Sequence, residues 1–447
     1  VADESIWFDL ADKHGTTDFL GYDTQTSEGQ ILAILQDGNV VDSVSKGDDV
    51  MLVLNQTPFY AESGGQIADN GYIFVENNKI KITDVKKKAG IFIHMGKVLS
   101  GEIISGSSAE LLVNSDMRSG ICNSHTATHL LNEALRSKLG EHIAQRGSLN
   151  AEDRLRFDFS HSKSMTSEEL SDVEIEVNSL IRQNSSVETR IMTPDDARGL
   201  GAQALFGEKY GDEVRVVSMG NKKDSGKGLT GNTYSLELCG GTHVSRTGEI
   251  GAFALIGESA SAGGVRRIEA LTGKAAELYH AEQSNILNDL ARIFKTKTEN
   301  ILDRVKALLD EKKMLQNEII NLRKAVAMSS KDESQETVKI NNFNFYVQTF
   351  EDVPSKDLRS LVDEHKNRLG SGVILLLSGA GGKAAISVGV TSDLTDKVNA
   401  VDLVKIAAAE LGGKGGGGRP DMAQAGGTDI SNAKKAISLV ENYLKEL

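Results

Sequence analysis

Short runs of alternating apolar and polar residues fill the chain from about residue 19 to residue 112. Successive side chains of a strand point to opposite faces of its sheet, so this period of two predicts half-buried strands. Turn residues such as Asp37-Gly38-Asn39 separate the runs. The alternating runs are residues 30–35, 49–54, 71–75, 79–83 and 90–94. The pattern predicts a small antiparallel β-barrel, or a sandwich, as an N-terminal domain of residues 1–112.

The pattern becomes mixed between about residues 116 and 276. Apolar residues recur on one helical face from 127 to 139, and Gly140 follows as a helix stop. Residues 167–181 predict a second helix. Alternation predicts strands at residues 154–159, 189–193 and 236–239. We therefore predict an α+β core domain over residues 113–274.

Residues 275–330 have a helical pattern throughout. The spacing of Thr296 and Glu299 is that of a capping box, which indicates the start of a second helix. Apolar side chains recur in steps of about three and four residues, and only Lys312 interrupts the stripe. The stripe consists of Ile301, Val305, Leu308, Leu315, Ile319, Leu322 and Val326. We predict an antiparallel helical hairpin that acts as a spacer, because its outer faces are charged. A dimer contact and an ordinary pair of packed core helices are the alternatives.

A polar stretch at residues 329–335 precedes a last α/β domain, which we place at residues 331–447. We expect a protease-accessible linker between about residues 324 and 336. Predicted strands lie at residues 338–350, 373–377 and 384–390, and predicted helices at 356–369, 401–411 and 431–444. The sequence as a whole predicts an α+β multidomain protein.

A glycine-rich segment, residues 412–427, separates the last two predicted helices. We predict a surface loop at residues 412–418. Its backbone N–H groups, with Lys414 and Arg419, suit a phosphate or an RNA backbone. No Lys-Ser/Thr pair follows the glycines, so the segment is not a Walker A loop. A flexible loop without a ligand is the alternative.

Composition limits the class of protein. The chain has 447 residues, a formal net charge of −13 and two cysteines. Two cysteines argue against a disulfide-stapled secreted protein and favour a cytoplasmic one. No run of about twenty apolar residues is present, so we expect no membrane span. Residues 1–9 resemble no signal peptide, and a start at Val1 suggests a fragment or a processed product.

Two short pairs of residues suggest a metal site. His125 and His129 are four apart on a predicted helix, so both imidazoles lie on one face. Cys239 and His243 bracket two glycines, which suit a tight loop. Three histidines and one cysteine would fill the tetrahedral shell of Zn²⁺. We predict that these four residues bind one zinc ion.

Other interpretations of these residues stay open at this stage. Histidines four apart on an apolar helix are often packed or capping residues rather than ligands. Cys122 is an alternative ligand, but its apolar surroundings favour a place in the core. Cys239 and a histidine could instead form a nucleophile pair, although nothing nearby in the sequence marks an activated thiol.

Five motifs follow one another along the chain: Phe59-Tyr-Ala-Glu-Ser-Gly-Gly-Gln66, His125-Thr-Ala-Thr-His129, Gln145-Arg-Gly-Ser148, Leu155-Arg-Phe-Asp-Phe-Ser-His161 and Cys239-Gly-Gly-Thr-His243. Taken in order, they resemble the C-terminal portion of alanyl-tRNA synthetases, which carries an editing domain. The resemblance spans essentially the whole chain, with the segment around Arg419-Pro-Asp421 similar to the DHHA1-type domain that closes those enzymes. The aminoacylation domain of those enzymes is absent here, so we expect no tRNA charging from this portion alone.

The resemblance implies hydrolysis of tRNA(Ala) mischarged with serine or glycine. Such a second site is needed because a pocket for alanine rejects an analogue lacking one methyl by only about 1–3 kcal/mol. Thr128 and Gln145 match family positions and are suited to recognise a hydroxyl. The resemblance also implies tRNA binding at the elbow by the C-terminal domain, and possible oligomerisation through it. A closed four-ligand shell favours a positioning role for zinc.

Two other classes of function are compatible with the sequence. The first is a non-catalytic tRNA-binding module in which zinc is purely structural. The second is a different hydrolase, because Gly64-Gly65-Gln66 echoes the tripeptide of release factors and the terminal domain recurs in phosphoesterases. No Asp/His cluster of the phosphoesterase metal type is present, which disfavours this second class.

Overall fold

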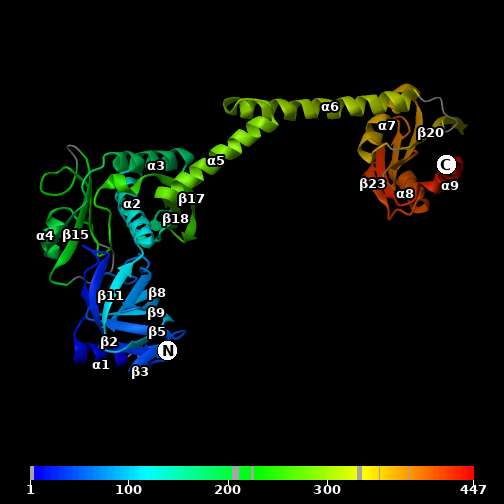
Figure 1. Ribbon diagram of the computed structural model, residues 1–447. Coiled ribbons are helices and arrows are strands. Elements are labelled where there is room, and N and C mark those ends of the chain that lie inside the picture. Colours follow the sequence, from blue (N-terminus) through cyan, green and yellow to red (C-terminus); the bar gives the residue numbers. More distant parts are fainter. Residues whose placement is uncertain (1–4, 204–210, 223–225, 330–334, 352, 381) are drawn as a thin grey trace. The chain divides into compact units, whose positions relative to one another are not determined.

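A computed structural model of the protein describes residues 5–203, 211–222, 226–329, 335–351, 353–380 and 382–447 (Figure 1). These residues fall into two compact units, Val1–Asp289 and Leu290–Leu447, which we describe separately. Within the described ranges, no helix is both long and apolar enough to cross a membrane. The predicted linker at 324–336 falls partly on residues 330–334, which lie outside the described residues. The division into four domains stays a prediction.

The first unit begins with a closed barrel of six strands. Its strands follow the order β11-β7-β8-β9-β5-β2, and β11 also pairs with β2, which closes the sheet; β3 extends β2. Apolar residues from each alternating run point into the barrel core, as predicted. Others in the same runs, such as Leu35, Val53 and Ile93, belong to a second apolar cluster outside that core. The strands are β2 Thr26–Gln36, β3 Asn39–Val41, β5 Asp49–Leu54, β7 Gly71–Val75, β8 Asn78–Lys88, β9 Ile91–Ser100 and β11 Ser108–Val113.

Short elements complete the barrel. Helix α1, Ser5–His14, was not expected from the sequence; its Trp7 and Leu10 pack on the outside of the barrel strands. The short strands are β1 Asp18–Phe19, which pairs with β6 Gln56–Thr57, and β4 Ser43–Ser45, which pairs with β10 Glu102–Ile104.

The predicted α+β core follows the barrel in the same unit. Its sheets have the orders β12-β13-β18-β17 and β14-β15-β16, and helices α2 and α3 pack against the first sheet around one apolar core. The helices are α2 Ser115–Leu139, α3 Ser167–Arg182 and α4 Pro194–Gly199. The strands are β12 Gln145–Asn150, β13 Leu155–Ser160, β14 Glu188–Met192, β15 Val214–Asn221, β16 Thr233–Leu238, β17 Phe253–Ala262 and β18 Val265–Thr272. A 3₁₀ turn, Thr247–Ile250, precedes β17.

A buried ion pair joins the barrel to helix α2. The Arg118 Nε donates to both carboxylate oxygens of Asp69, at 2.9 and 3.1 Å. Its two other nitrogens donate to the backbone oxygens of Gly21 and Pro58, each at 2.8 Å. The second Asp69 oxygen also accepts the N–H of Tyr60 at 2.6 Å. The pair therefore ties α2 to both sides of the loop that leads to Gln66.

Helices α5, Gly273–Ile293, and α6, Ile301–Ser329, occupy the segment of the predicted hairpin. The prediction of a capping box at Thr296 and Glu299 is wrong. A 3₁₀ turn, Thr298–Asn300, precedes α6, and no side chain caps that turn. Their antiparallel pairing stays a prediction. Much of the apolar stripe of α6 is exposed, including Leu315, Ile319, Leu322 and Val326.

The second unit contains a six-stranded sheet of order β19-β20-β21-β22-β24-β23. One apolar cluster lies between the sheet and helices α8 and α9. A second apolar cluster lies between the sheet and helix α7. The strands are β19 Gln335–Ile340, β20 Phe343–Glu351, β21 Gly372–Ala380, β22 Lys383–Val390, β23 Gly416–Arg419 and β24 Met422–Gly427. The helices are α7 Ser355–Leu369, α8 Ala400–Glu410 and α9 Ala433–Glu446, and a 3₁₀ turn, Ile430–Asn432, precedes α9.

The prediction of a surface loop at residues 412–418 is wrong for its second half. Residues 416–419 form strand β23, which pairs with β24 at the edge of the sheet. Glycine is needed there because the backbone lies against helix α8: a Cβ on Gly416 would approach Val404 to 2.8 Å. The glycines therefore allow close packing rather than disorder.

Candidate metal centre

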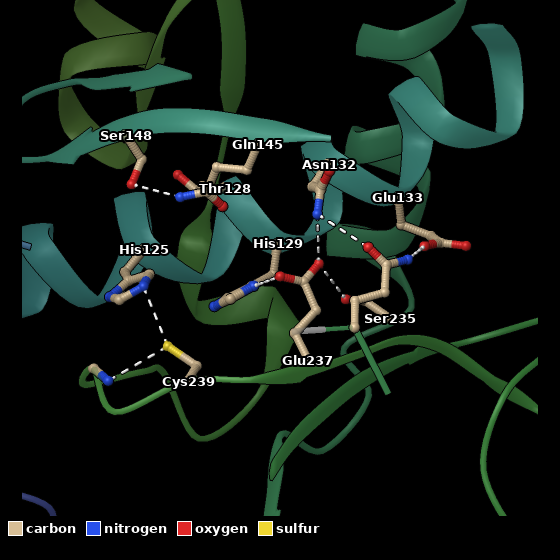
Figure 2. Close-up of polar contacts among 12 residues, drawn as sticks. His125, Thr128, His129, Asn132, Glu133, Gln145, Ser148, Ser235, Glu237 and Cys239 are labelled. Carbon is tan, nitrogen blue, oxygen red and sulfur yellow. Dashed lines mark hydrogen bonds and ion pairs between the residues drawn. The ribbon is translucent and has the colours of Figure 1, made fainter. Parts of the chain in front are cut away.

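Helix α2 presents the first predicted pair of ligands. Asn114 caps it through a bond from the Met117 N–H to the Asn114 side chain. Spacing of four residues places the rings of His125 and His129 side by side, with centroids 5.2 Å apart. Both imidazoles are buried and point toward Cys239 (Figure 2). The helix thus supplies two parallel nitrogen donors on one face.

The loop after strand β16 presents the second pair. The Cys239 Sγ lies 3.4 Å from the Nε2 of His125 and 3.3 Å from the Nε2 of His243. A side chain at position 241 would collide with His125, since a Cβ there would lie 2.1 Å from its Cε1. Gly241 is therefore what lets the loop approach the helix. The donor atoms of all four predicted ligands, including His129, lie within 4.8 Å of one another.

A carboxylate orients His129. The Nδ1 of His129 lies 2.5 Å from Oε2 of Glu237, and the amide of Asn132 donates to the other carboxylate oxygen at 2.9 Å (Figure 2). This contact turns the Nε2 of His129 toward the cluster centre. That atom is buried and has no hydrogen-bond partner among the described residues. A cation at the centre would satisfy it, so the donor set fits zinc.

Gln66, at the end of the barrel's glycine loop, orients His125. Its Oε1 accepts from the Nδ1 of His125 at 2.8 Å and from the N–H of Thr242 at 2.9 Å. Its amide nitrogen donates to the hydroxyl of Thr242 at 2.8 Å. The buried Gln66 therefore joins the barrel, the helix and the Cys-His loop at one point.

A hydroxyl orients the third histidine. Thr126 donates to the carbonyl of Cys122 at 2.7 Å, so its oxygen accepts from the Nδ1 of His243 at 3.2 Å. The Cys122 thiol itself donates to Thr242 and packs in the apolar core. Cys122 therefore stands outside the cluster, as the sequence favoured.

The four donors form one electrostatic unit. Burial would raise the pKa of the Cys239 thiol, but the surrounding imidazoles, with His125 first, hold that pKa well below its usual value. Burial would lower the pKa of His129, but Glu237 and the Cys239 thiolate raise it to about 10. Burial lowers the pKa of His243 to about 3, which leaves that ring neutral. Metal binding needs a thiolate and neutral imidazoles, so a cation bound here would displace the proton that the raised pKa of His129 implies.

A cavity of about 280 Å³ opens beside the cluster. Both predicted editing residues, Thr128 and Gln145, line it, together with three of the predicted ligands. Gln145 donates to the hydroxyl of Ser148 at 3.1 Å, and both come from strand β12 (Figure 2). The remaining walls are formed by Tyr60, Ser63, Gly64, Glu213, Val214, Arg215, Glu237, Leu238, Gly240 and Gly241.

The hydroxyl of Thr128 has a defined polarity. It lies 2.6 Å from Oδ1 of Asn150 and 2.9 Å from the backbone oxygen of Ser124, two acceptors that compete for its one proton. A hydroxyl has one proton and two lone pairs. Thr128 therefore offers an acceptor, not a donor, to a molecule in the cavity.

Some residues of the site were not predicted from the sequence. Glu237 had a usable signal, because a charged residue two before Cys239 on a strand shares its face. Asn150 and Arg215 had none, since only the folded chain brings them to the cavity. Lys414 and Arg419 are exposed and belong to the second unit, where Arg419 pairs with Asp421 at 3.1 Å.

Three family descriptions match parts of the chain. "tRNA synthetases class II (A)" matches residues 3–117, which contain the barrel. "Threonyl and Alanyl tRNA synthetase second additional domain" matches residues 214–269, which include Cys239 and His243. "DHHA1 domain" matches residues 342–446 of the second unit.

Whole-chain relatives are also found. An alanine–tRNA ligase of Jannaschia sp. (strain CCS1) is 57% identical over 445 residues, which cover 100% of this chain and 50% of that protein. An alanine–tRNA ligase of Cereibacter sphaeroides (strain ATCC 17029 / ATH 2.4.9) is 58% identical over 439 residues, which cover 98% of this chain and 50% of that protein. The chain thus spans about half the length of these relatives. The crystal structure of the C-Ala domain from Aquifex aeolicus alanyl-tRNA synthetase is 32% identical, with a TM-score of 0.24, and covers 25% of this chain and 98% of that one. From its matched segments and its relatives, the chain belongs to the alanyl-tRNA synthetase family.

Proposed function

We propose that this chain hydrolyses the ester bond of tRNA(Ala) mischarged with serine or glycine and spares alanyl-tRNA(Ala). The observation that carries the proposal is the cavity of about 280 Å³, which places Thr128 and Gln145 beside His125, His129 and Cys239. The ester is already activated, so hydrolysis needs no ATP. The barrier lies in placing the ester, the water and the polarising groups together.

Selection among amino acids follows from the polarity of Thr128. A serine hydroxyl would donate to the Thr128 oxygen, whose own proton is already taken up by Asn150 or Ser124. An alanine methyl at the same place would cover that oxygen without bonding to it, which costs about 1–3 kcal/mol. Glycine places nothing there. Gln145, which lines the same cavity, would complete recognition of the hydroxyl.

Zinc is the cofactor that the donor set supports. His125, His129, Cys239 and His243 would hold it, and when bound it would supply a Lewis acid that positions the aminoacyl ester. Gln66, Glu237 and Thr126 would keep the imidazoles aligned.

Single-turnover deacylation tests the function. With saturating enzyme and no ATP, seryl-tRNA(Ala) and glycyl-tRNA(Ala) should lose labelled amino acid well above the spontaneous rate, and alanyl-tRNA(Ala) should not. Thr128→Val, nearly isosteric without the oxygen, should narrow the serine-to-alanine ratio by about 10-fold, the lower range of one hydrogen bond left unmade. Gln145→Ala should also narrow the serine-to-alanine ratio of deacylation rates. A wild-type rate equal to spontaneous decay would leave a tRNA-binding module with a structural zinc.

We also propose that the second unit binds the tRNA backbone through Lys414 and Arg419. Both are exposed, and within the described part of the chain the one ion pair of Arg419 is a surface pair with Asp421. The double variant Lys414→Ala/Arg419→Ala should weaken binding to unrelated tRNAs equally and lower the salt slope by about two, at about 0.9 per duplex phosphate. Binding across a salt series measures this.

Lys383→Ala/Lys397→Ala, which removes the same charge from other described positions of this unit, is the matched control. An equal loss in both double variants would show a general charge effect and reject the specific contact.

A further inference from the structure

Arg215, on strand β15, is held rigidly beside the cavity. Its guanidinium lies over the ring of Tyr22, 4.1 Å from the centroid. Its Nη1 donates to the backbone oxygens of Cys239 and Gly241, each at 2.9 Å. The hydroxyl of Tyr22 donates to the carbonyl between them, that of Gly240, at 2.7 Å. Stacking and these bonds set the plane of the guanidinium before any ligand arrives.

Two nitrogens of the guanidinium make no hydrogen bond among the described residues. Among the hydrogen bonds of the described residues, Arg215 uses Nη1 only, which leaves Nε and Nη2 as donors. Arg215 is half-buried, and it is the one lysine or arginine among the described residues that line the cavity. Of the two lining carboxylates, Glu237 is occupied by His129, and Glu213 makes no ion pair with Arg215 within 4.0 Å in the described residues.

A fixed cation beside the cavity can attract an anionic group of a ligand. The amino acid of an aminoacylated RNA is esterified to the terminal ribose, and the nearest negative charge is the phosphodiester on the 5′ oxygen of the same ribose. The chain carries a net charge of −13, so a phosphate needs a local positive group to approach. A planar, permanently charged guanidinium with two free donors matches phosphate oxygens.

We propose that Arg215, stacked on Tyr22, binds the phosphate of the terminal nucleotide of the aminoacylated RNA and so sets the depth at which the ester enters the cavity. The inference rests on the proposed function for its substrate class. Because Nη1 holds the Cys239–Gly241 backbone, the same side chain links the RNA end to the loop of the metal centre. Arg215 is thus assigned to substrate binding, apart from the residues that select the amino acid.

The test is binding of a deacylated RNA hairpin that reproduces the acceptor stem and single-stranded 3′ end of tRNA(Ala), measured by fluorescence anisotropy over a salt series. Arg215→Gln should weaken binding about 10-fold, as for a lost charged hydrogen bond. It should lower the salt slope by about 0.7, the value for one phosphate of a single strand. Arg215→Lys should keep the slope and lose part of the affinity. Arg198→Gln is the matched control, an exposed arginine on α4 paired with Asp195, and should change neither.

Zinc content separates this role from a structural one. Arg215→Gln with unchanged slope would overturn the proposal, whether or not zinc is retained. If Arg215→Gln both loses zinc and lowers the salt slope, Cys239→Ala separates the two causes, because it removes a zinc ligand and keeps the arginine. A wild-type slope in Cys239→Ala supports the phosphate contact, and an equal loss overturns it. The readout needs no hydrolysis, so failure of wild-type deacylation would reject the proposed function while leaving this result readable.

Discussion

Replacing Cys239 by alanine is expected to remove zinc from the purified protein and to slow deacylation of seryl-tRNA(Ala) by about 100-fold, the cost of misplacing reacting groups by about 1 Å. The thiolate lies between two imidazoles, at 3.4 Å from His125 and 3.3 Å from His243. Without it three histidines remain, which leaves the tetrahedral shell of zinc one protein ligand short. Elemental analysis gives zinc per chain, and single-turnover kinetics gives the rate.

The other cysteine provides a matched control. Cys122 lies three residues before His125, but its thiol bonds to Thr242 and packs in the core. Cys122→Ala should therefore keep zinc and activity. Glu237→Gln should be intermediate, with zinc bound about 10–100-fold more weakly, as for other lost orienting carboxylates. Undiminished zinc in Cys239→Ala would refute the four-ligand site.

The metal ligands could be predicted because each pair is encoded locally. Helix geometry alone places His125 and His129, four residues apart, on one face of a helix. The glycines between Cys239 and His243 indicate a tight loop. Only the coming together of the two pairs, over more than a hundred residues, required the fold or the family resemblance. The structure supplies that step by placing strand β16 against helix α2.

The residues that orient the ligands were harder to predict, because their partners are distant in sequence. Gln66 belongs to the barrel, yet its side chain bonds to His125 and Thr242 in the core domain. Arg215 reaches the loop of Cys239 only because β15 and β16 are neighbours. No local pattern contains such contacts.

The glycine-rich composition of residues 412–418 led to a wrong prediction, because several of these glycines allow close packing. The run from Gly412 to Gly418 suggested a loop, but a Cβ on Gly413 would lie 2.2 Å from the backbone oxygen of Gly426. Glycine is required by the close approach of β24 and α8, and part of the run is a strand. A single sequence cannot separate glycines that allow motion from glycines that allow contact.

Breaking the buried pair between Asp69 and Arg118 should have the largest effect on stability. Asp69→Ala leaves the guanidinium of Arg118 buried without its carboxylate and frees the N–H of Tyr60. Loss of one partner of a buried ion pair costs about 3–5 kcal/mol. We expect the unfolding transition of the first unit to shift by that amount, with the second unit unaffected. Denaturant unfolding followed by hydrogen exchange reports each unit separately, which a single two-state fit would not.

Asp172→Ala is the control, because it breaks the exposed pair of Lys138 with Asp172, which should contribute at most about 1 kcal/mol. The Asp69 variant should also lose deacylation before it unfolds. Arg118 holds the carbonyl of Pro58, and Asp69 holds the N–H of Tyr60, so both anchor the loop that ends at Gln66. If Gln66 moves, His125 loses the acceptor that aligns it. Unchanged stability and unchanged zinc affinity in Asp69→Ala would show that the barrel does not support the metal centre through this pair.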